Sequence, residues 1–384
     1  MTKLLDFGNL HHLSLFIDDP QHRYPENMLN DICLISTKLQ SLSLHSDDFP
    51  LWAYSRVAFR LDETCLIWRI PHLKSLELDV GSTLTRPILV LLSELPLQSL
   101  TLTSFATSIS TQSPRLHFPA LLNLSLTTTV SCVIDIMQSV SFPNATDIFL
   151  NIDDEGPIQE HRTTFHTIYS SFPASLRRLH IEVTFGTMEP VEDIAWLGPG
   201  ALNFDAFVRP LQPLRDLREL KLNVWLAEHI DGFLELRNSD LRSLIPAWPR
   251  LSFFEYTIQL MGLPMPPLER DDPTLDTILA FARAHPHLLH LFLTRMRMDP
   301  LPDDPPPLED ATRPLEGHGL LWLKLGESAN APSGLEPIAR VVDRAFPRVS
   351  KELRRAHALY ERLKWSFLER ELCALHRERF EDAA

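Results

Sequence analysis

The stretch FPALLNLSL, residues 118–126, decides the fold, because its leucines follow the order L-x-x-L-x-L. Related stretches are IPHLKSLEL at 70–78, FPASLRRLHI at 172–181 and HPHLLHLFL at 285–293. Alignment of the chain on this phrase gives eleven candidates, and the intervals from the third candidate to the sixth are all equal. The candidates begin at Leu10, Leu39, Leu73, Leu97, Leu121, Ala145, Leu176, Leu217, Leu251, Leu288 and Leu320. The chain is therefore built from repeats.

The residues between the repeated leucines predict that each phrase is a short strand. Alternate residues of a strand point to opposite faces, so positions 3, 5 and 7 of the phrase should face away from positions 4 and 6. Apolar residues are far rarer at positions 3, 5 and 7 than in the whole chain, where they make up 44%. Each phrase therefore predicts a strand with one buried face and one exposed face.

Helix-like stretches separate several of these strands. They are apolar enough to pack on one side and occur at 84–95, 130–140, 161–172 and 274–285. A proline follows each of them closely in the sequence. Because proline cannot continue a helix, we expect each helix to end there and the chain to turn directly into the next strand.

Alternating strands and helices also occur in doubly wound sheets and barrels, but a stack of repeats is favoured here. A single repeat loses more conformational free energy on ordering than its few leucines regain by burial, so neighbouring repeats must share one continuous core. We therefore expect an α/β leucine-rich-repeat solenoid over residues 1–327, with a parallel concave sheet and convex helices. A C-terminal helical cap is expected over residues 328–384.

Three inserts interrupt the second half of the chain, at 185–213, 261–273 and 296–318. The last is acidic and rich in proline, and all three are expected to be loops outside the stack. Residues 335–382 are expected to be helical, but their apolar stripe is too short to favour a coiled coil. We expect a helix folded on the last repeat, with a partner-binding helix as the alternative.

Composition limits the classes of partner. The formal net charge is −14, so nucleic acid is a poor partner and a basic protein surface is a better one. Acidic pairs follow three strands and are expected along one rim, where they either attract that partner or only solubilise loops. These residues are Asp18, Asp19, Asp47, Asp48, Asp153 and Asp154.

The sequence also bounds the compartment. It has no apolar run long enough to cross a bilayer and no secretory signal, so we expect no membrane span and a cytoplasmic or nuclear location. The four cysteines lie far apart, which favours buried, reduced thiols.

No motif indicates catalysis, a metal or a cofactor. His285, His287 and His290 lie close in sequence, but no carboxylate or cysteine accompanies them, so we expect solvated histidines. The glycines of GHGLLWLKLGE at 317–327 lack the spacing of a phosphate loop. A Ser/His/Asp triad drawn from distant residues remains open, since sequence cannot exclude it. We therefore expect a protein that is not an enzyme.

The exposed strand face changes along the chain, from mostly Ser and Thr in early repeats to aromatic and charged residues later. Exposed aromatic residues beside charges are typical of protein interfaces. The expected binding residues on this concave face are Phe149, His180, Lys221, Phe253, Glu255, Phe292 and Trp322. The alternative is an ordinary sheet face packed by inserts or by the terminal helix.

The irregular [FILW]-P-x-L-x-x-L-x-L phrases, the acidic proline-rich inserts and the charged C-terminal helix resemble fungal F-box/leucine-rich-repeat proteins over about residues 10–327. The resemblance implies a substrate receptor of a cullin-RING ubiquitin ligase, in which an F-box binds the ligase adaptor and the repeats bind the substrate. No L-P-x-E-[IL] segment of an F-box type occurs near the N-terminus, so no F-box residue is assigned.

Two readings of this N-terminus follow. Little sequence precedes Leu10 to cover the first strand, so we expect either a chain that continues upstream or a partner at that edge.

The alternative function is a free-standing scaffold or a regulator like those of GTPases, although such regulators have more regular repeats.

Overall fold

The computed structural model describes residues 10–17, 36, 38–46, 70–79, 83–103, 106–109, 114–154, 161–185, 203–226, 234–260, 271–294, 296–297, 318–325, 336–349 and 372. The fold is α/β, with eleven strands in one large parallel sheet that follow chain order. The chain divides into two compact units, which are described separately. The first comprises Met1–Glu155 with Thr163–Leu176, and the second comprises Gly156–Arg162 with Arg177–Ala384.

Six strands of the large sheet lie in the first unit. They are β1 (His12–Ile17), β2 (Ser41–Ser46), β3 (Ser75–Asp79), β5 (Ser99–Thr103), β8 (Asn123–Thr129) and β10 (Asp147–Asp154). Each strand pairs in parallel with the next, and the registers place leucines beside leucines, as with Leu76, Leu100 and Leu124. These side chains are at most 4% exposed. Adjacent strands therefore bury their leucines in shared rows, as the sequence predicted.

Helices and short strands connect the main strands of this unit. The helices are α2 (Arg86–Glu94), α3 (Val130–Ser139) and α4 (His161–Ser170), each close to the predicted range. Four short strands also form two small parallel pairs: β4 (Thr83–Thr85) with β6 (Ala106–Ser108), and β7 (Leu116–His117) with β9 (Val140–Ser141). Helix α3 contacts both β8 and β10, so it packs across neighbouring repeats.

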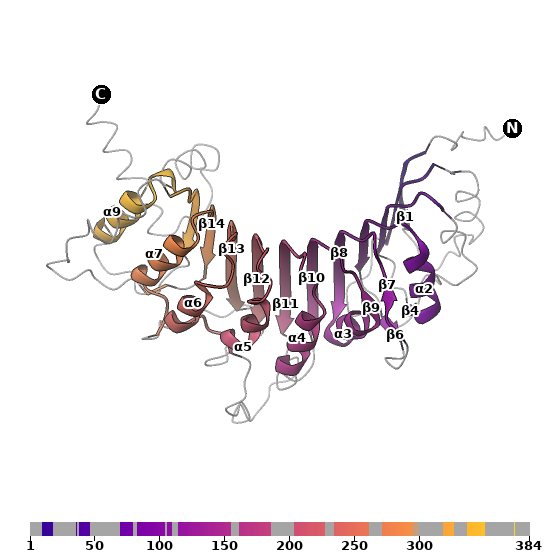
Figure 1. The fold of residues 1–384 in the computed structure, drawn as a ribbon, viewed down its shortest axis with the longest axis horizontal. Helices are drawn as coiled ribbons and strands as arrows, with labels where there is room; N and C mark the ends of the chain where they lie inside the picture. Colours follow the sequence, from indigo (N-terminus) through magenta and orange to yellow (C-terminus); the bar gives the residue numbers. More distant parts are fainter. Residues whose placement is uncertain are drawn as a thin grey trace. The chain divides into compact units, whose positions relative to one another are not determined.

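The second unit contains five strands of the large sheet and further helices. The strands are β11 (Arg178–Phe185), β12 (Glu219–Leu226), β13 (Phe253–Leu260), β14 (His290–Leu293) and β15 (Trp322–Leu325). The helices are α5 (Phe204–Val208), the 3-10 turn η6 (Arg209–Leu211), α6 (Asn238–Leu244), α7 (Leu275–Ala284) and α9 (Glu336–Ala345) (Figure 1). No helix of the described ranges is long and apolar enough to cross a membrane.

The proline of the repeated phrase occupies a turn of constant form. In this turn the backbone N–H of the first phrase residue donates to the carbonyl three residues earlier, as from Leu121 to Phe118 at 3.3 Å. Proline stands second in five of these turns, where its fixed φ favours the bend, and it stands first in the turn from Pro173 to Leu176. The residue before the proline is buried in these turns: Ile70, Phe118, Phe142, Trp248 and His285. The proline thus sets the entry to the strand as well as ending the helix.

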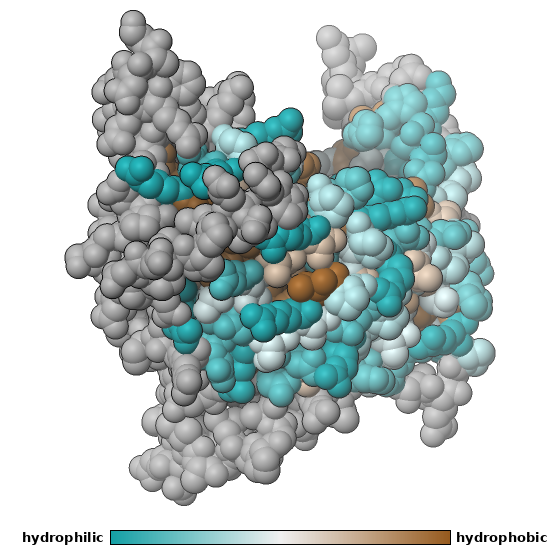
Figure 2. Space-filling view, turned by 60° about the vertical axis from the view of Figure 1, so that its left-hand side comes forward, coloured by the Kyte–Doolittle hydropathy of each residue, from teal (hydrophilic) through white to brown (hydrophobic). Residues whose placement is uncertain are grey.

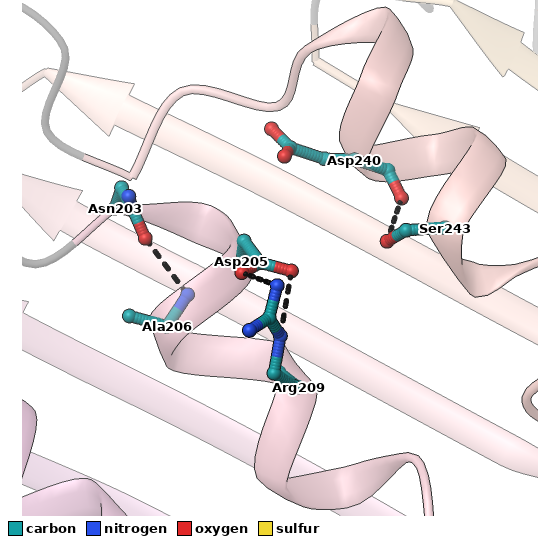
Figure 3. A network of polar contacts seen from close by, with 6 residues as sticks. All are labelled: Asn203, Asp205, Ala206, Arg209, Asp240 and Ser243. Atoms are coloured by element: carbon teal, nitrogen blue, oxygen red, sulfur yellow. Dashed lines mark hydrogen bonds and ion pairs between the residues drawn. The ribbon is translucent and has the colours of Figure 1, made fainter.

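The predicted insert at 185–213 is partly helical, because α5 and η6 fall inside it. The Asn203 side chain accepts from the Ala206 N–H at 2.8 Å and begins α5, and Asp205 pairs with Arg209 (Figure 3). Phe204 and Phe207 of this short helix are buried and pack it in place. Their helical spacing was not recognised in the sequence because the surrounding stretch is rich in proline. Helix α6 was also missed.

The structure describes only the first part of the predicted C-terminal helical segment. Helix α9 buries Ile338, Val341 and Val342, which fits a helix packed on the repeats. The His318 ring, just before β15, meets the Phe346 ring after α9 edge-on at 5.6 Å. Apart from Leu372, the predicted helix beyond residue 349 lies outside the described residues, and so do 261–270 and 298–317 of the other inserts.

Two neighbouring residues of β8 provide a test of the shared core. Leu126 is fully buried, whereas Ser125 faces the exposed side. We expect Leu126→Ala to lower the free energy of unfolding by about 2–5 kcal/mol, because it leaves a cavity shared with the rows of β5 and β10. Ser125→Ala should change it by less than about 0.5 kcal/mol. Urea unfolding monitored by circular dichroism would measure both, and equal effects would contradict the assigned faces.

Candidate functional site

The exposed face of strands β11–β15 carries the predicted binding residues in two rows. The strand registers define the rows, since residues at equivalent positions lie side by side. The first row is Arg178, Glu219, Phe253, His290 and Trp322, and the second row is His180, Lys221, Glu255, Phe292 and Lys324. All are exposed or half-buried. Six of the seven predicted residues therefore lie on one face, and Phe149 lies half-buried on β10 of the first unit.

Four rings form a contiguous group on β13, β14 and β15, which we call the aromatic cluster: Phe253, His290, Phe292 and Trp322. The His290 ring stacks on Phe253 at 5.1 Å between centroids and lies nearly parallel to Trp322 at 6.5 Å. Phe292 meets Phe253 and His290 edge-on, at 5.6 and 6.3 Å. The sequence predicted three members of the cluster, and the register adds His290. Its position on the exposed face of a predicted strand could have indicated that it belongs to the cluster.

A lysine completes one end of the cluster. The Lys221 Nζ lies 4.6 Å from the centroid of the Phe253 ring, within the range of a cation–π contact. Lys221 is on β12 and His290 is on β14, so they flank Phe253 from opposite sides. Lys221, His290 and Phe292 therefore all contact the Phe253 ring, which leaves only part of the ring for a partner.

Burial and Lys221 together keep the histidines of this face neutral. Desolvation lowers the pKa of His290, and the charge of Lys221 lowers it further. Desolvation also lowers the pKa of His180, again with Lys221, while Glu182 opposes the shift. Because the unfolded pKa is about 6.5, both imidazoles are neutral at pH 7. The positive charge of the two rows at that pH comes from Arg178, Lys221 and Lys324.

Glu255 stands out among the acidic groups of the face. Desolvation raises the pKa of its carboxyl, and the charges of Lys221 and Lys324 act in the opposite direction. Within the described part of the chain, no hydrogen bond to this carboxylate is formed. A half-buried acceptor between two lysines and two phenylalanine rings can therefore take a donor from a bound molecule.

The neighbouring polar side chains are, in contrast, already bonded to each other. Trp225 Nε1 donates to Glu182 at 3.0 Å, and Thr257 Oγ1 donates to the Asn223 amide oxygen at 2.7 Å. The Asn223 amide nitrogen lies 3.3 Å from His180 Nε2, which then acts as the acceptor. This network satisfies the hydrogen-bonding groups of these polar side chains in the carboxyl-terminal half of β11–β13. The aromatic cluster is therefore the part of the face that offers a partner the most contacts.

The expectation that all the histidines of HPHLLH are solvated was wrong for His285. This residue is fully buried, and its Nδ1 donates to the Phe281 carbonyl at 2.8 Å. Desolvation lowers the pKa of His285, and His318 adds to the effect although the Phe281 bond opposes it. His290 faces the exposed side in the aromatic cluster. No group of metal-ligating residues occurs within the described ranges.

The predicted acidic rim is mostly outside the described residues. Asp18, Asp19, Asp47 and Asp48 lie there, as does the side chain of Asp154. Asp153 is half-buried at the end of β10. The acidic rim therefore stays a prediction.

The role of Lys221 in the electrostatics can be tested by titration. Lys221→Gln removes the positive charge that disfavours protonation, so we expect the pKa of His180 and of His290 to rise toward the ordinary value of about 6.5. Proton NMR of the imidazole C–H signals between pH 5 and pH 8 would follow both groups.

Lys221→Arg is the matched control, because it keeps the charge and should leave both pKa values nearly unchanged. The wild-type protein should also lose stability as the pH falls below about 6.5, since its unfolded state then binds more protons than its folded state. Equal titration of all three proteins would contradict the electrostatic coupling.

Two comparisons of the sequence with known proteins do not assign a function to this face. The chain matches no protein-family model, and none of the curated proteins matches it. The rings, the lysines and the half-buried Glu255 carboxylate are the observations on which a function can be based.

Proposed function

We propose that the chain is a leucine-rich-repeat solenoid that binds another protein through the exposed face of β11–β15. The aromatic cluster carries the proposal, because half-exposed aromatic rings grouped on a sheet face are typical of the residues that contribute most to binding. Figure 2 gives the contrast: the described surface in that view is mostly hydrophilic, and hydrophobic side chains appear in small patches. A compact aromatic group on such a surface favours specific contact over general adhesion.

Three features support the solenoid. Each of the eleven strands of the large sheet carries the leucine phrase, and each strand lies beside the strands of the preceding and following phrases. Most turns before the strands close with the same backbone hydrogen bond, and in five of them a buried residue precedes the proline. Helices between strands supply the second layer, as α3 does against β8 and β10. In this proposal the exposed strand face is the concave one.

The resemblance to F-box/leucine-rich-repeat proteins extends the proposal to a role in ubiquitination. In that role the repeats hold a substrate for a cullin-RING ligase in the cytoplasm or nucleus, and the chain itself performs no catalysis. A free-standing scaffold is the competing role, and it uses the same face. Co-purification of the ligase adaptor with protein expressed from the complete gene distinguishes them: a stable complex favours the receptor, and its absence favours the scaffold.

Binding by the aromatic cluster can be tested with a displayed library of random peptides selected on the immobilised full chain. Phe292→Ala with Trp322→Ala removes two half-exposed rings, and we expect it to weaken the enriched peptides by at least about tenfold. Leu122→Ala is the control, since Leu122 is an exposed leucine of the first unit, 40% accessible and outside the cluster. Far-ultraviolet circular dichroism would confirm that each variant is folded.

The proposal fails if no peptide is enriched on the wild-type chain. It also fails if the enriched peptides bind the double variant as tightly as the wild-type protein, because another surface would then be responsible.

A further inference from the structure

The residues immediately before the first row form a third line along the amino-terminal edge of β11–β15, which we call the edge row: Arg177, Arg218, Ser252, Leu289 and Leu321. Backbone hydrogen bonds of 2.7–2.8 Å join each member to the next, beginning with the Arg218 N–H to the Arg177 carbonyl. These bonds hold the edge row at the spacing of the sheet, about 4.8 Å per strand.

The chemistry of the edge row changes from one end to the other. Arg177 and Arg218 are exposed, and Arg178 of the first row is exposed beside them. Leu289 is 37% exposed, one of only two large hydrophobic residues so exposed among the described residues, and Leu321 is half-buried. A basic end over β11–β12 is therefore continuous with an apolar end over β14–β15.

The apolar end adjoins the aromatic cluster. Leu289 and Leu321 directly precede His290 and Trp322 in the chain, and these two rings are stacked at 6.5 Å. A Cβ placed on Gly319 would lie 3.5 Å from Leu289 Cδ2, so the leucine extends toward the turn that leads into β15. Exposed Leu289 and half-buried Leu321 thus extend the apolar surface of the cluster to the start of β14 and β15.

We propose that this edge binds an extended segment of a partner protein that is acidic at one end and apolar at the other. Its carboxylates lie against Arg177 and Arg218, and its apolar side chains lie against Leu289, Leu321 and the edge of the aromatic cluster. This inference rests on the proposed function and names the class of partner for the same face. Four strand spacings of about 4.8 Å span about 19 Å, which an extended chain covers with about six residues.

Charge complementarity favours an acidic segment over a basic one. At the β11–β12 end, Arg177 and Arg218 are exposed, although the chain as a whole carries −14. Of the carboxylates close to them in sequence, Glu219 is half-buried, and exposed Asp216 is paired with Arg250 at 2.8 Å. An arginine guanidinium donates two parallel hydrogen bonds to a carboxylate, which adds direction to the attraction. A basic segment would be repelled from the same arginines.

The direct test is fluorescence anisotropy with two labelled peptides on the full chain. The acidic probe is Asp-Glu-Gly-Ser-Leu-Phe, and the basic probe is Lys-Arg-Gly-Ser-Leu-Phe. We expect the acidic probe to bind at least about tenfold more tightly, and its affinity to fall as salt is added.

Substitutions at the basic and apolar ends of the edge row then test which part of the peptide binds at each end. Arg177→Glu with Arg218→Glu should weaken the acidic probe at least about tenfold and abolish its preference over the basic probe. Leu289→Ser should weaken both probes about fivefold, because both carry the apolar end. Arg242→Glu with Arg283→Glu makes the same change of net charge on helices α6 and α7, where both arginines are exposed, and it should leave binding unchanged.

Several results would overturn the inference. They are an acidic probe that does not bind at millimolar concentration, equal binding of the two probes, and equal effects of the edge-row and helix charge reversals. If the peptide library yields ligands that need Trp322 but are basic or neutral, this inference fails while the proposed function stands. If the library yields no ligand, the proposed function fails as well.

Discussion

Shared burial of leucines between neighbouring strands is the constraint on which the rest of this structure depends. No strand can cover its own apolar face, so Leu76, Leu100 and Leu124 must lie in one row and must do so in register. A slip of one residue would turn every leucine to the exposed side. The same register places the residues of the other face in rows, so the alignment of the core also produces the alignment of the candidate site.

Much of the fold follows from this constraint and is predictable from the sequence. The eleven strands, and helices α2, α3, α4 and α7, lie close to where the spacing of apolar residues placed them. The elements that were missed are short: α5 has five residues and α6 has seven, too few for a clear helical period. The small pairs of two- and three-residue strands leave no periodic signal at all.

The sequence predicted which residues the candidate site contains better than it predicted the contacts between them. Phe253, Phe292 and Trp322 were identified from their strand positions, but their contacts depend on which strands are neighbours. His285 was misjudged, although the sequence held the signal. It precedes a proline in the position where other repeats carry the buried Phe118, Phe142 or Trp248, so the turn predicts a core side chain there.

The turn that precedes β2, β3, β8 and β10 to β14 has a consequence for how the repeats can vary in length. It closes within four residues, so the entry to a strand is determined locally, whatever the length of the connection before it. The intervals between phrases accordingly differ widely while the register is kept, from the short step between Leu97 and Leu121 to the long one between Leu176 and Leu217. Loops of such a protein can lengthen or shorten by mutation between fixed points, and whole repeats can be duplicated or lost without reshaping their neighbours.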